Sequence, residues 1–410
     1  MSSTAMAGSA PLPSAASSAT EPPVNRLPAL AALLALAGGA LWLGDAVSGR
    51  QAVLYLLGGA LGVVLYHAAF GFTHAFRVFL TDGRGAGIRA QMVMLAVACA
   101  LFFPALGHGS LFGQSVGGII FPVGTAVVAG AFMFGIGMQI AGGCASGTLY
   151  TIGGGSTAML VTLAFFIVGS TVGAPHLPWW NSLPRFESVW LIGELGWLPA
   201  LAVNLAVFGA VYALTVWLEK RRHGTLQHEL NSSAVTDGPL WRRMLRGRWP
   251  LLWGAVALAV LNFATLAVAG RPWGITNAFT LWGSKVAMNW NEDILFWDYW
   301  ADAAQATALE SSIFTDITTV MNFGLIAGAL LAAALAGRFA PNLRLPWRIL
   351  AASIIGGLLL GYGARISTGC NISAYFGGVA SGSLHGWVWL PAALAGNWVG
   401  LRLRPWFRPA

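Results

Sequence analysis

Two cysteines in this sequence stand in the same local setting and are the first candidates for chemistry. Cys144 follows Gly143, Cys370 follows Gly369, and a short run containing small polar residues comes after each cysteine. A helix that begins at such a break presents free N–H groups and the positive end of its dipole to the thiol. This arrangement attracts anions and favours the thiolate, whereas an apolar environment favours the neutral thiol, and the sequence leaves both open. The two cysteines are therefore candidates for contacts with an anion, or else small apolar residues of a core.

The two cysteines lie in matching Gly-rich segments of the chain. Residues 135–144 (GIGMQIAGGC) match residues 361–370 (GYGARISTGC) at an offset of 226 (370 minus 144). Residues 71–76 (GFTHAF) match residues 274–279 (GITNAF) at an offset of 203 (274 minus 71), and the difference of 23 (226 minus 203) fits an insertion within residues 291–316. Duplicated halves with Gly-interrupted apolar segments are typical of transporters that bind substrate between the repeats. We expect inverted repeats, although the sequence does not fix the number of membrane crossings.

Five polar residues in or next to these segments are further candidates for the same site. Arg365 occupies the position of Gln139 in the other copy and lies inside an apolar stretch. An arginine at membrane depth costs at least about 2.5–3.5 kcal/mol on insertion scales, so it should face an anion pathway or reach the interface with its side chain. His74 and Asn277 are also equivalents, and are candidates for donors to an oxyanion or for hydrogen bonds between helices. Asn371, in the turn after the second cysteine, is the fifth, and the glycines Gly143 and Gly369 before the two cysteines complete the predicted substrate pathway.

The composition predicts the elements that must position these residues. Of the 410 residues, 57% are hydrophobic and 9% are charged, whereas about 25% are charged in soluble proteins. These values exclude a soluble globule, and the apolar runs do not alternate as the strands of a β-barrel would. We predict an all-α polytopic membrane protein with about nine or more spanning helices and short re-entrant half-helices.

The chain divides into four predicted regions. Residues 1–27 are rich in Ala, Ser and Pro and are expected to form a disordered tail without a signal peptide. Two repeat halves follow at residues 28–218 and 250–410, joined by a basic connection at residues 219–249. By the positive-inside rule this connection is cytoplasmic, and the acidic segment at residues 291–316 lies on the opposite side of the membrane.

Other classes of chemistry are not expected. The net charge of +8 comes from basic residues that mostly flank apolar runs, which indicates orientation in a lipid bilayer and no nucleic-acid partner. The cysteines and histidines show no metal-ligand spacing and no P-loop is present, so we expect no metal, no cofactor and no ATP hydrolysis. The third cysteine, Cys99, lies within an ordinary apolar run and is expected to pack in the core.

The Gly-Cys segments resemble the YeeE/YedE family of bacterial inner-membrane proteins. The resemblance is carried by residues 135–147 (GIGMQIAGGCASG), 361–373 (GYGARISTGCNIS) and 381–387 (SGSLHGW), and it covers most of the chain after the tail. It implies an hourglass-shaped, pseudo-symmetric bundle that takes up thiosulfate or a related sulfur compound across the inner membrane. It also implies that central thiols, here Cys144 and Cys370, pass the ion along by transient hydrogen bonds. A small cytoplasmic sulfurtransferase resembling TusA is the implied partner.

The sequence departs from this family at one position, and the departure keeps several functions open. Members carry another cysteine in a Phe-Cys-Phe-like stretch, where this chain has Gly71 within residues 70–77 (FGFTHAFR). We expect a non-enzymatic transporter of a small sulfur-containing anion, with a selenium compound or another small anion as alternative substrates. The rival functions are a membrane thiol enzyme, such as a sulfurtransferase or dithiol oxidoreductase that uses Cys144 and Cys370 covalently, and a membrane scaffold for a soluble sulfurtransferase.

Overall fold

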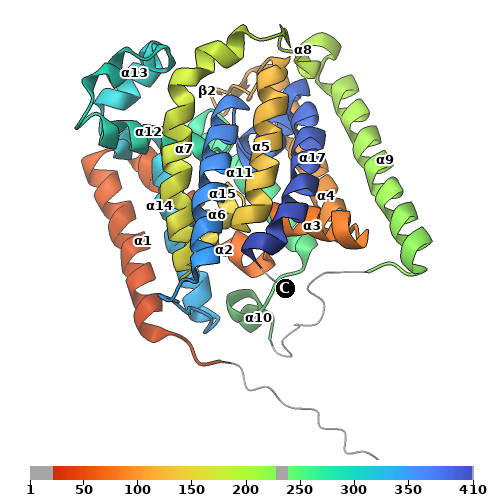
Figure 1. The fold of residues 1–410 in the computed structure, drawn as a ribbon, viewed down its shortest axis with the longest axis horizontal. Coiled ribbons are helices and arrows are strands. Elements are labelled where there is room, and N and C mark those ends of the chain that lie inside the picture. The colour runs from red at the N-terminus through yellow and green to blue at the C-terminus, as the bar shows by residue number, and fades with distance from the viewer. Residues whose placement is uncertain (1–21, 228–238, 409–410) are drawn as a thin grey trace, which may run out of the picture.

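The structure, a computed structural model, describes residues 22–227 and 239–408 and is almost entirely helical (Figure 1). Nine segments of this described part are long and apolar enough to span a membrane, which confirms the predicted all-α polytopic fold. Most of the expected tail, residues 1–21, lies outside the described residues, and the first helix begins at Arg26. The nine segments are Arg26–Ala46, Gly49–Asp82, Ala86–His108, Thr125–Gly153, Thr157–Ser182, Trp197–His223, Leu251–Ala269, Ile317–Leu335 and Trp347–Ala380.

Three of these segments are broken within their length, and the breaks coincide with the Gly-rich stretches of the sequence. The first break separates α2 from α3, the second separates α5 from α6, and the third separates α15 from the π-helix η5. Irregular backbone at membrane depth is tolerated where protein buries it or where it lines a polar path. The helices of the bundle are α1 (Arg26–Ala46), α2 (Gly49–Ala68), α3 (Phe72–Asp82), α4 (Ala86–His108), α5 (Thr125–Ala141), α6 (Ala145–Gly153), α7 (Thr157–Ser182), α9 (Trp197–His223), α11 (Leu251–Ala269), α12 (Thr276–Ala287), α14 (Ile317–Leu335), α15 (Trp347–Ile366), η5 (Asn371–Gly377), α16 (Gly378–Ala380) and α17 (Leu384–Phe407).

The remaining elements are short and lie in the connections. Two small antiparallel pairs of strands occur, with Ser110 opposite Ser115 in one and Val123 opposite Phe186 in the other. The acidic segment at residues 291–316 is folded into short helical turns. These elements are β1 (Ser110–Leu111), β2 (Gln114–Ser115), β3 (Val123–Gly124), β4 (Arg185–Phe186), α8 (Leu191–Leu195), α10 (Leu240–Arg246), η2 (Glu292–Phe296), η3 (Asp298–Trp300), α13 (Ala303–Glu310) and η4 (Ile313–Thr315).

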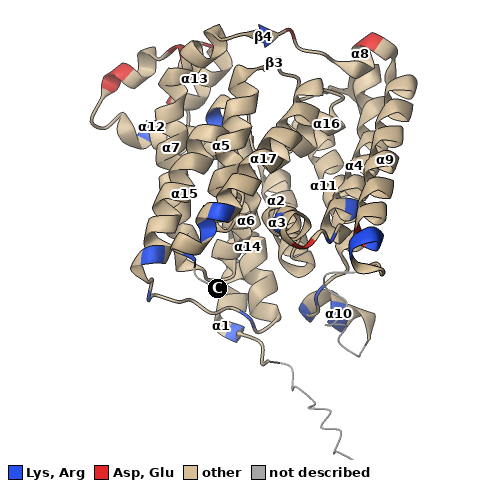
Figure 2. Cartoon of the chain, turned by 45° about the vertical axis from the view of Figure 1, so that its right-hand side comes forward, with Lys and Arg blue, Asp and Glu red and all other residues tan. Residues whose placement is uncertain are grey.

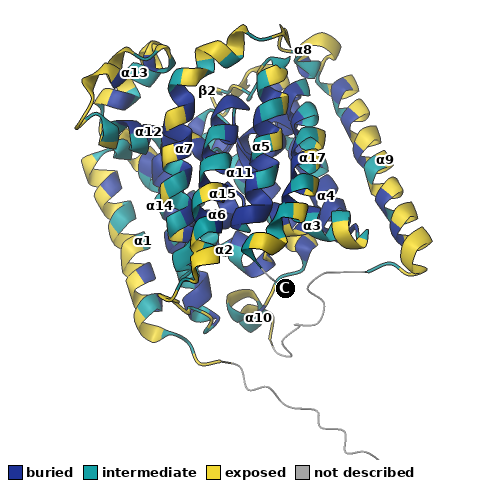
Figure 3. Cartoon of the chain, viewed as in Figure 1, coloured by how far each residue is buried: buried dark blue, intermediate teal, exposed yellow. Residues whose placement is uncertain are grey.

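The helices pack as two interlocked sets around α5 and α15. These two helices contact each other at the centre, α17 packs against α5, and α7 packs against α15. In the same way α2 packs against α14, and α4 packs against α11. Helices α1 and α9 lie on the outside of the bundle with most of their residues exposed (Figure 3), and their exposed side chains are largely apolar, as lipid contact requires.

Charged residues separate onto two opposite ends of the bundle (Figure 2). The end that carries α10 and the last turn of α9 is rich in Lys and Arg, and we call it the basic face. The end that carries α8 and α13 holds most of the Asp and Glu, and we call it the acidic face. Helix α9 continues to His223, so the domain boundary expected at residues 218–219 falls inside a helix, and residues 228–238 of the basic connection lie outside the described residues.

Candidate functional site

Cys144 stands at the point where the broken segment Thr125–Gly153 changes direction. Helix α5 ends at Gly142, whose φ of +85° suits a residue without a Cβ, and α6 begins directly after Cys144. The Cys144 Sγ accepts a hydrogen bond from the Gly147 N–H at 3.4 Å and lies 3.4 Å from Ser146 Oγ. The side chain is buried, so this thiol caps a half-helix inside the bundle.

Cys370 stands at the equivalent point of the other broken segment. Its backbone N–H donates to Ser373 Oγ at 3.2 Å, and its Sγ lies 3.8 Å from the same hydroxyl, so Cys370 caps η5. The thiol is buried, and α6 and η5 contact each other, which brings the two cysteine-capped helices together inside the bundle. Both sequence candidates therefore lie at helix starts, where backbone N–H groups are free to bind an anion.

The glycines before the two cysteines match in the sequence but differ in conformation. Gly369 has a φ of +153°, and a Cβ built there would lie 2.9 Å from the Ala374 N and in contact with Ser373 Oγ. A Cβ at Gly143 would meet Met159 Sδ at 3.5 Å, which is an ordinary contact.

We therefore expect Gly369→Ala to destabilise the protein by about 1–3 kcal/mol, because the added Cβ makes the backbone conformation strained. The matched variant Gly143→Ala should be close to wild type. Thermal unfolding of the two purified variants in the same detergent tests this difference, and equal unfolding temperatures would show that the strain at Gly369 is relieved by a local shift.

Several buried polar atoms in this region have no hydrogen-bond partner within the protein. They include Thr73 Oγ1, Gln139 Oε1, Tyr375 Oη and both side-chain polar atoms of Asn371. The other end of the Gln139 amide donates to Thr73 O at 3.2 Å and to Asn397 Oδ1 at 2.6 Å, so its orientation is fixed. A buried polar group without a partner costs about 1–3 kcal/mol, and unsatisfied groups gathered beside two thiols are typical of a site that binds a polar ligand.

Arg365 and Asn277 lie together on the acidic side of these cysteines. They line a cavity of about 790 Å³, which we call the acidic-side cavity, and Ser373 beside Cys370 lines it too. The Arg365 side chain is nine-tenths buried; it donates to Thr280 Oγ1 at 3.2 Å and to Asn277 Oδ1 at 3.4 Å. Arg365 therefore faces a polar cavity within the protein. This is the first of the two settings expected from the sequence, an anion pathway or the membrane interface.

His74 lies on the opposite side of the bundle from its sequence equivalent Asn277. It lines a cavity of about 460 Å³ at the basic face, together with Arg84, Arg222 and His223, and its Nδ1 is 2.8 Å from Arg77 Nη2. The structure thus places His74 in one hollow and Arg365 and Asn277 in another. The other predicted residues line neither of these hollows; they are Gln139, Gly143, Cys144, Gly369, Cys370 and Asn371.

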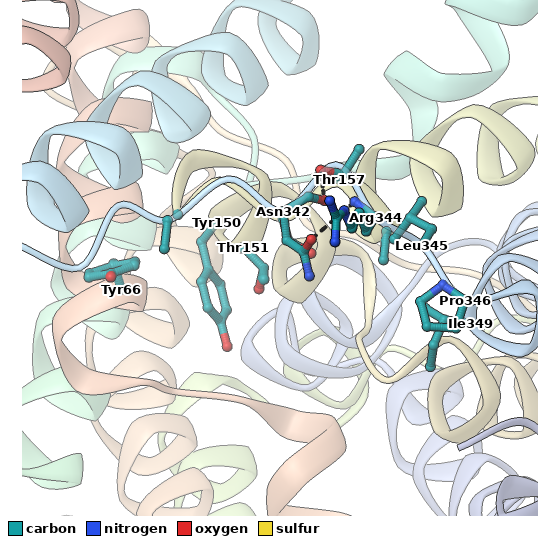
Figure 4. Close-up of a pocket in the computed structure, with 13 residues that line it drawn as sticks. Tyr66, Tyr150, Thr151, Thr157, Asn342, Arg344, Leu345, Pro346 and Ile349 are labelled. Carbon is teal, nitrogen blue, oxygen red and sulfur yellow. Dashed lines mark hydrogen bonds between the residues drawn. The ribbon is translucent and has the colours of Figure 1, made fainter. Parts of the chain in front are cut away.

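A third hollow, of about 410 Å³, lies between the start of α7 and the loop before α15 (Figure 4). Tyr66, Tyr150 and Arg344 line it, and Thr157 Oγ1 donates to Asn342 O at 2.6 Å in its wall.

A Cβ at Gly71 would lie 3.6 Å from Tyr150 Oη and make no closer contact. The position where the family has another cysteine therefore has room for a side chain.

Sequence reasoning missed several residues that the structure adds to the site. Thr280 and Tyr299 contact Arg365, while Tyr150 and Tyr375 lie in the half-helices α6 and η5 that follow the Gly-Cys breaks. Thr280 sits at the offset of 203 from Arg77, so the repeat could have identified it, but no repeat position corresponds to Tyr299. Within residues 22–227 and 239–408, no group of three or more His, Cys, Asp or Glu side chains could hold a metal ion.

This geometry defines a class of protein: a polytopic helical membrane protein with two buried, cysteine-capped half-helices between hollows on opposite faces. The chain belongs to the sulphur transport family, whose model matches residues 67–399, and the resemblance drawn from the motifs is thereby confirmed.

Named relatives agree with this family. The chain is 28% identical over 360 residues to the thiosulfate transporter TsuA of Spirochaeta thermophila, covering 84% of this chain and 96% of that protein. It is 24% identical over 364 residues to the thiosulfate transporter TsuA of Escherichia coli, covering 84% and 91%. It is also 34% identical over 165 residues to the probable transporter YedE of Escherichia coli, and this match spans only 39% of each chain.

Proposed function

We propose that this protein is a membrane transporter that takes up thiosulfate and passes it between the two hollows by non-covalent contacts with Cys144 and Cys370. The observation that carries the proposal is the pair of buried thiols, each at the start of a half-helix, with unsatisfied polar atoms of Gln139 and Asn371 in the adjoining helices. Each thiol is a weak donor, and weak contacts suit a pathway whose sites must release the ion as well as bind it. The similarity to two relatives named as thiosulfate transporters supports the choice of thiosulfate.

We infer further that the two halves are inverted repeats. A Cβ at Gly169 would meet the backbone oxygen of Leu358, and a Cβ at Gly396 would meet that of Phe132. Offsets that differ by one residue relate the two contacts, since 396 minus 169 is 227 and 358 minus 132 is 226. Helix α5 begins beside β3 at the acidic face, whereas α15 begins at the basic face, so equivalent helices run in opposite directions (Figure 2). Two halves related by such an inverted repeat would form one pathway with a similar hollow at each end.

The charge pattern supports an orientation in the membrane, and the family resemblance supports a membrane and a partner protein. We place the basic face in the cytoplasm and the protein in the bacterial inner membrane, in accordance with the positive-inside rule. A small TusA-like sulfurtransferase that receives the ion at the basic face is the partner we propose, and it is supported by the family resemblance.

Uptake of radiolabelled thiosulfate into proteoliposomes tests the function, with excess sulfate as the competitor. We expect saturable uptake by the wild type, and uptake about fivefold lower in Arg365→Gln, which is equivalent to about 1 kcal/mol. The reason is that glutamine, the residue at the equivalent position 139, keeps hydrogen-bonding groups but removes the positive charge. Arg348→Gln, at the exposed start of the same helix, is the matched control and should match the wild type.

Two outcomes would overturn the proposal. One is the absence of uptake by folded wild-type protein. The other is a persulfide adduct on Cys144 or Cys370 that forms during turnover, detected by intact mass spectrometry, because it would favour a thiol enzyme over non-covalent passage.

A further inference from the structure

The guanidinium of Arg365 is held by neutral side chains. Its Nη1 donates to Thr280 Oγ1 and to Tyr299 Oη, and its Nη2 donates to Asn277 Oδ1. The Nε is buried and has no partner. A guanidinium binds the two oxygens of an oxyanion in parallel through adjacent N–H groups, so an anion can displace these neutral oxygens.

Tyr299 closes the approach to this guanidinium. Its ring centroid lies 4.6 Å from the Arg365 Cζ, and its hydroxyl accepts a hydrogen bond from the same side chain. Tyr299 and Arg365 both line the acidic-side cavity, so their contact lies at its wall. The hydroxyl takes one donor of the guanidinium, and the ring covers one of its faces.

The segment that carries Tyr299 is an anchored part of the fold. Trp300 is buried beside Leu281, Ile294 and Leu309, and its ring packs edge-on to Tyr299 at 4.7 Å. Lys285 on α12 donates to the backbone oxygens of Leu309 and Ser311 and ties the far end of the segment down. The tyrosine is therefore held at the cavity by residues 291–316, the insertion that distinguishes the second half from the first.

The cavity lining leaves Arg365 as the group that attracts an anion. The lining includes three arginines and three aspartates, so its formal charges balance. Arg271 lies 3.9 Å from Asp316, which pairs one of these arginines with a carboxylate. Among the lining arginines, Arg365 combines deep burial with an Nε that has no partner, and a charge-assisted hydrogen bond is strongest in such a setting.

We propose that Arg365 forms an entry site for a small oxyanion and that Tyr299 competes with the anion for it, so that Tyr299 sets the affinity of this site. The inference rests on the proposed transport function and adds to it a residue from the insertion. The anion takes the place of the Tyr299 hydroxyl on Nη1 of Arg365, and the returning hydroxyl helps to release the ion toward Cys370.

The test is a double-mutant cycle on the binding of radiolabelled thiosulfate to purified protein, measured by equilibrium dialysis. Tyr299→Phe removes the competing hydroxyl and keeps the ring, and we expect its Kd to be about tenfold lower than that of the wild type. In the Arg365→Gln background the same substitution should leave the Kd unchanged. Tyr362→Phe is the matched control, because Tyr362 lies three residues before Arg365 and its hydroxyl bonds to His176 and Trp180.

The outcomes separate this inference from the transport function. If thiosulfate is taken up but Tyr299→Phe binds it as the wild type does, the entry site is wrong and transport stands. An equal tightening in both backgrounds would also overturn the entry site, since the effect would not pass through Arg365. A Tyr299 effect that depends on Arg365, together with no uptake by the wild type, would support the anion site and reject transport.

Discussion

Replacing Cys144 or Cys370 by serine is expected to lower thiosulfate uptake about thirtyfold, equivalent to about 2 kcal/mol of the transport barrier. A serine hydroxyl is smaller than a thiol and forms shorter, stronger hydrogen bonds, so it contacts the sulfur of the ion less well and exchanges partners less readily. The loss of one matched contact at a buried site is worth about 1–3 kcal/mol. Initial rates of uptake into proteoliposomes, at equal amounts of reconstituted protein, measure the effect.

Cys99→Ser is the matched control for both variants. Cys99 is equally buried in α4, but its Sγ contacts the backbone oxygen of Val379 at 3.6 Å, and a serine hydroxyl can donate to the same oxygen. We expect uptake by this variant within about twofold of the wild type. Wild-type rates in Cys144→Ser and Cys370→Ser would show that neither thiol lies on the pathway, and equal losses in all three variants would point to a general effect of burying serine.

The broken spans were predictable from the sequence because their cause is local. Gly142 and Gly369 interrupt apolar runs at positions where the backbone has a positive φ, and a cysteine caps the helix that follows each break. Composition alone was enough to predict the all-α polytopic class, because the apolar runs are too long and too continuous for any other fold. The helix ends were less predictable, since α9 continues past residue 218 to His223 with four basic residues in its last turn.

In the candidate site, the sequence predicted residues that lie in or next to the repeated segments. The offsets identified Arg365 with Gln139 and His74 with Asn277, but not that His74 and Asn277 lie in hollows at opposite ends. Tyr299 was not predictable, because it comes from an insertion without a counterpart and meets Arg365 through a contact between residues 66 positions apart. Such contacts depend on tertiary packing, which spacing along the chain does not encode.

The other large effect that we expect is a loss of stability when Glu219, a buried carboxylate outside the sequence motifs, is replaced. Glu219 near the end of α9 is fully buried and pairs with Arg89 at 2.8 Å and with Arg84 at 3.3 Å. It also accepts hydrogen bonds from the backbone N–H groups of Gly85 at 2.9 Å and Gln227 at 2.7 Å. Three of these contacts tie the outer helix α9 to the start of α4, and the fourth ties it to the segment that follows α9, beside the hollow that contains His74 and Arg84.

Glu219→Gln is therefore expected to destabilise the protein by about 3–5 kcal/mol, because it leaves Arg89 buried without a countercharge and turns an amide donor toward N–H groups. Thermal unfolding in detergent, followed by circular dichroism at a fixed scan rate, measures the change. Glu194→Gln, on the exposed helix α8, is the control and should unfold with the wild type. If both variants unfold at the wild-type temperature, water reaches Arg89 in the folded protein, and α9 is held to α4 by apolar packing alone.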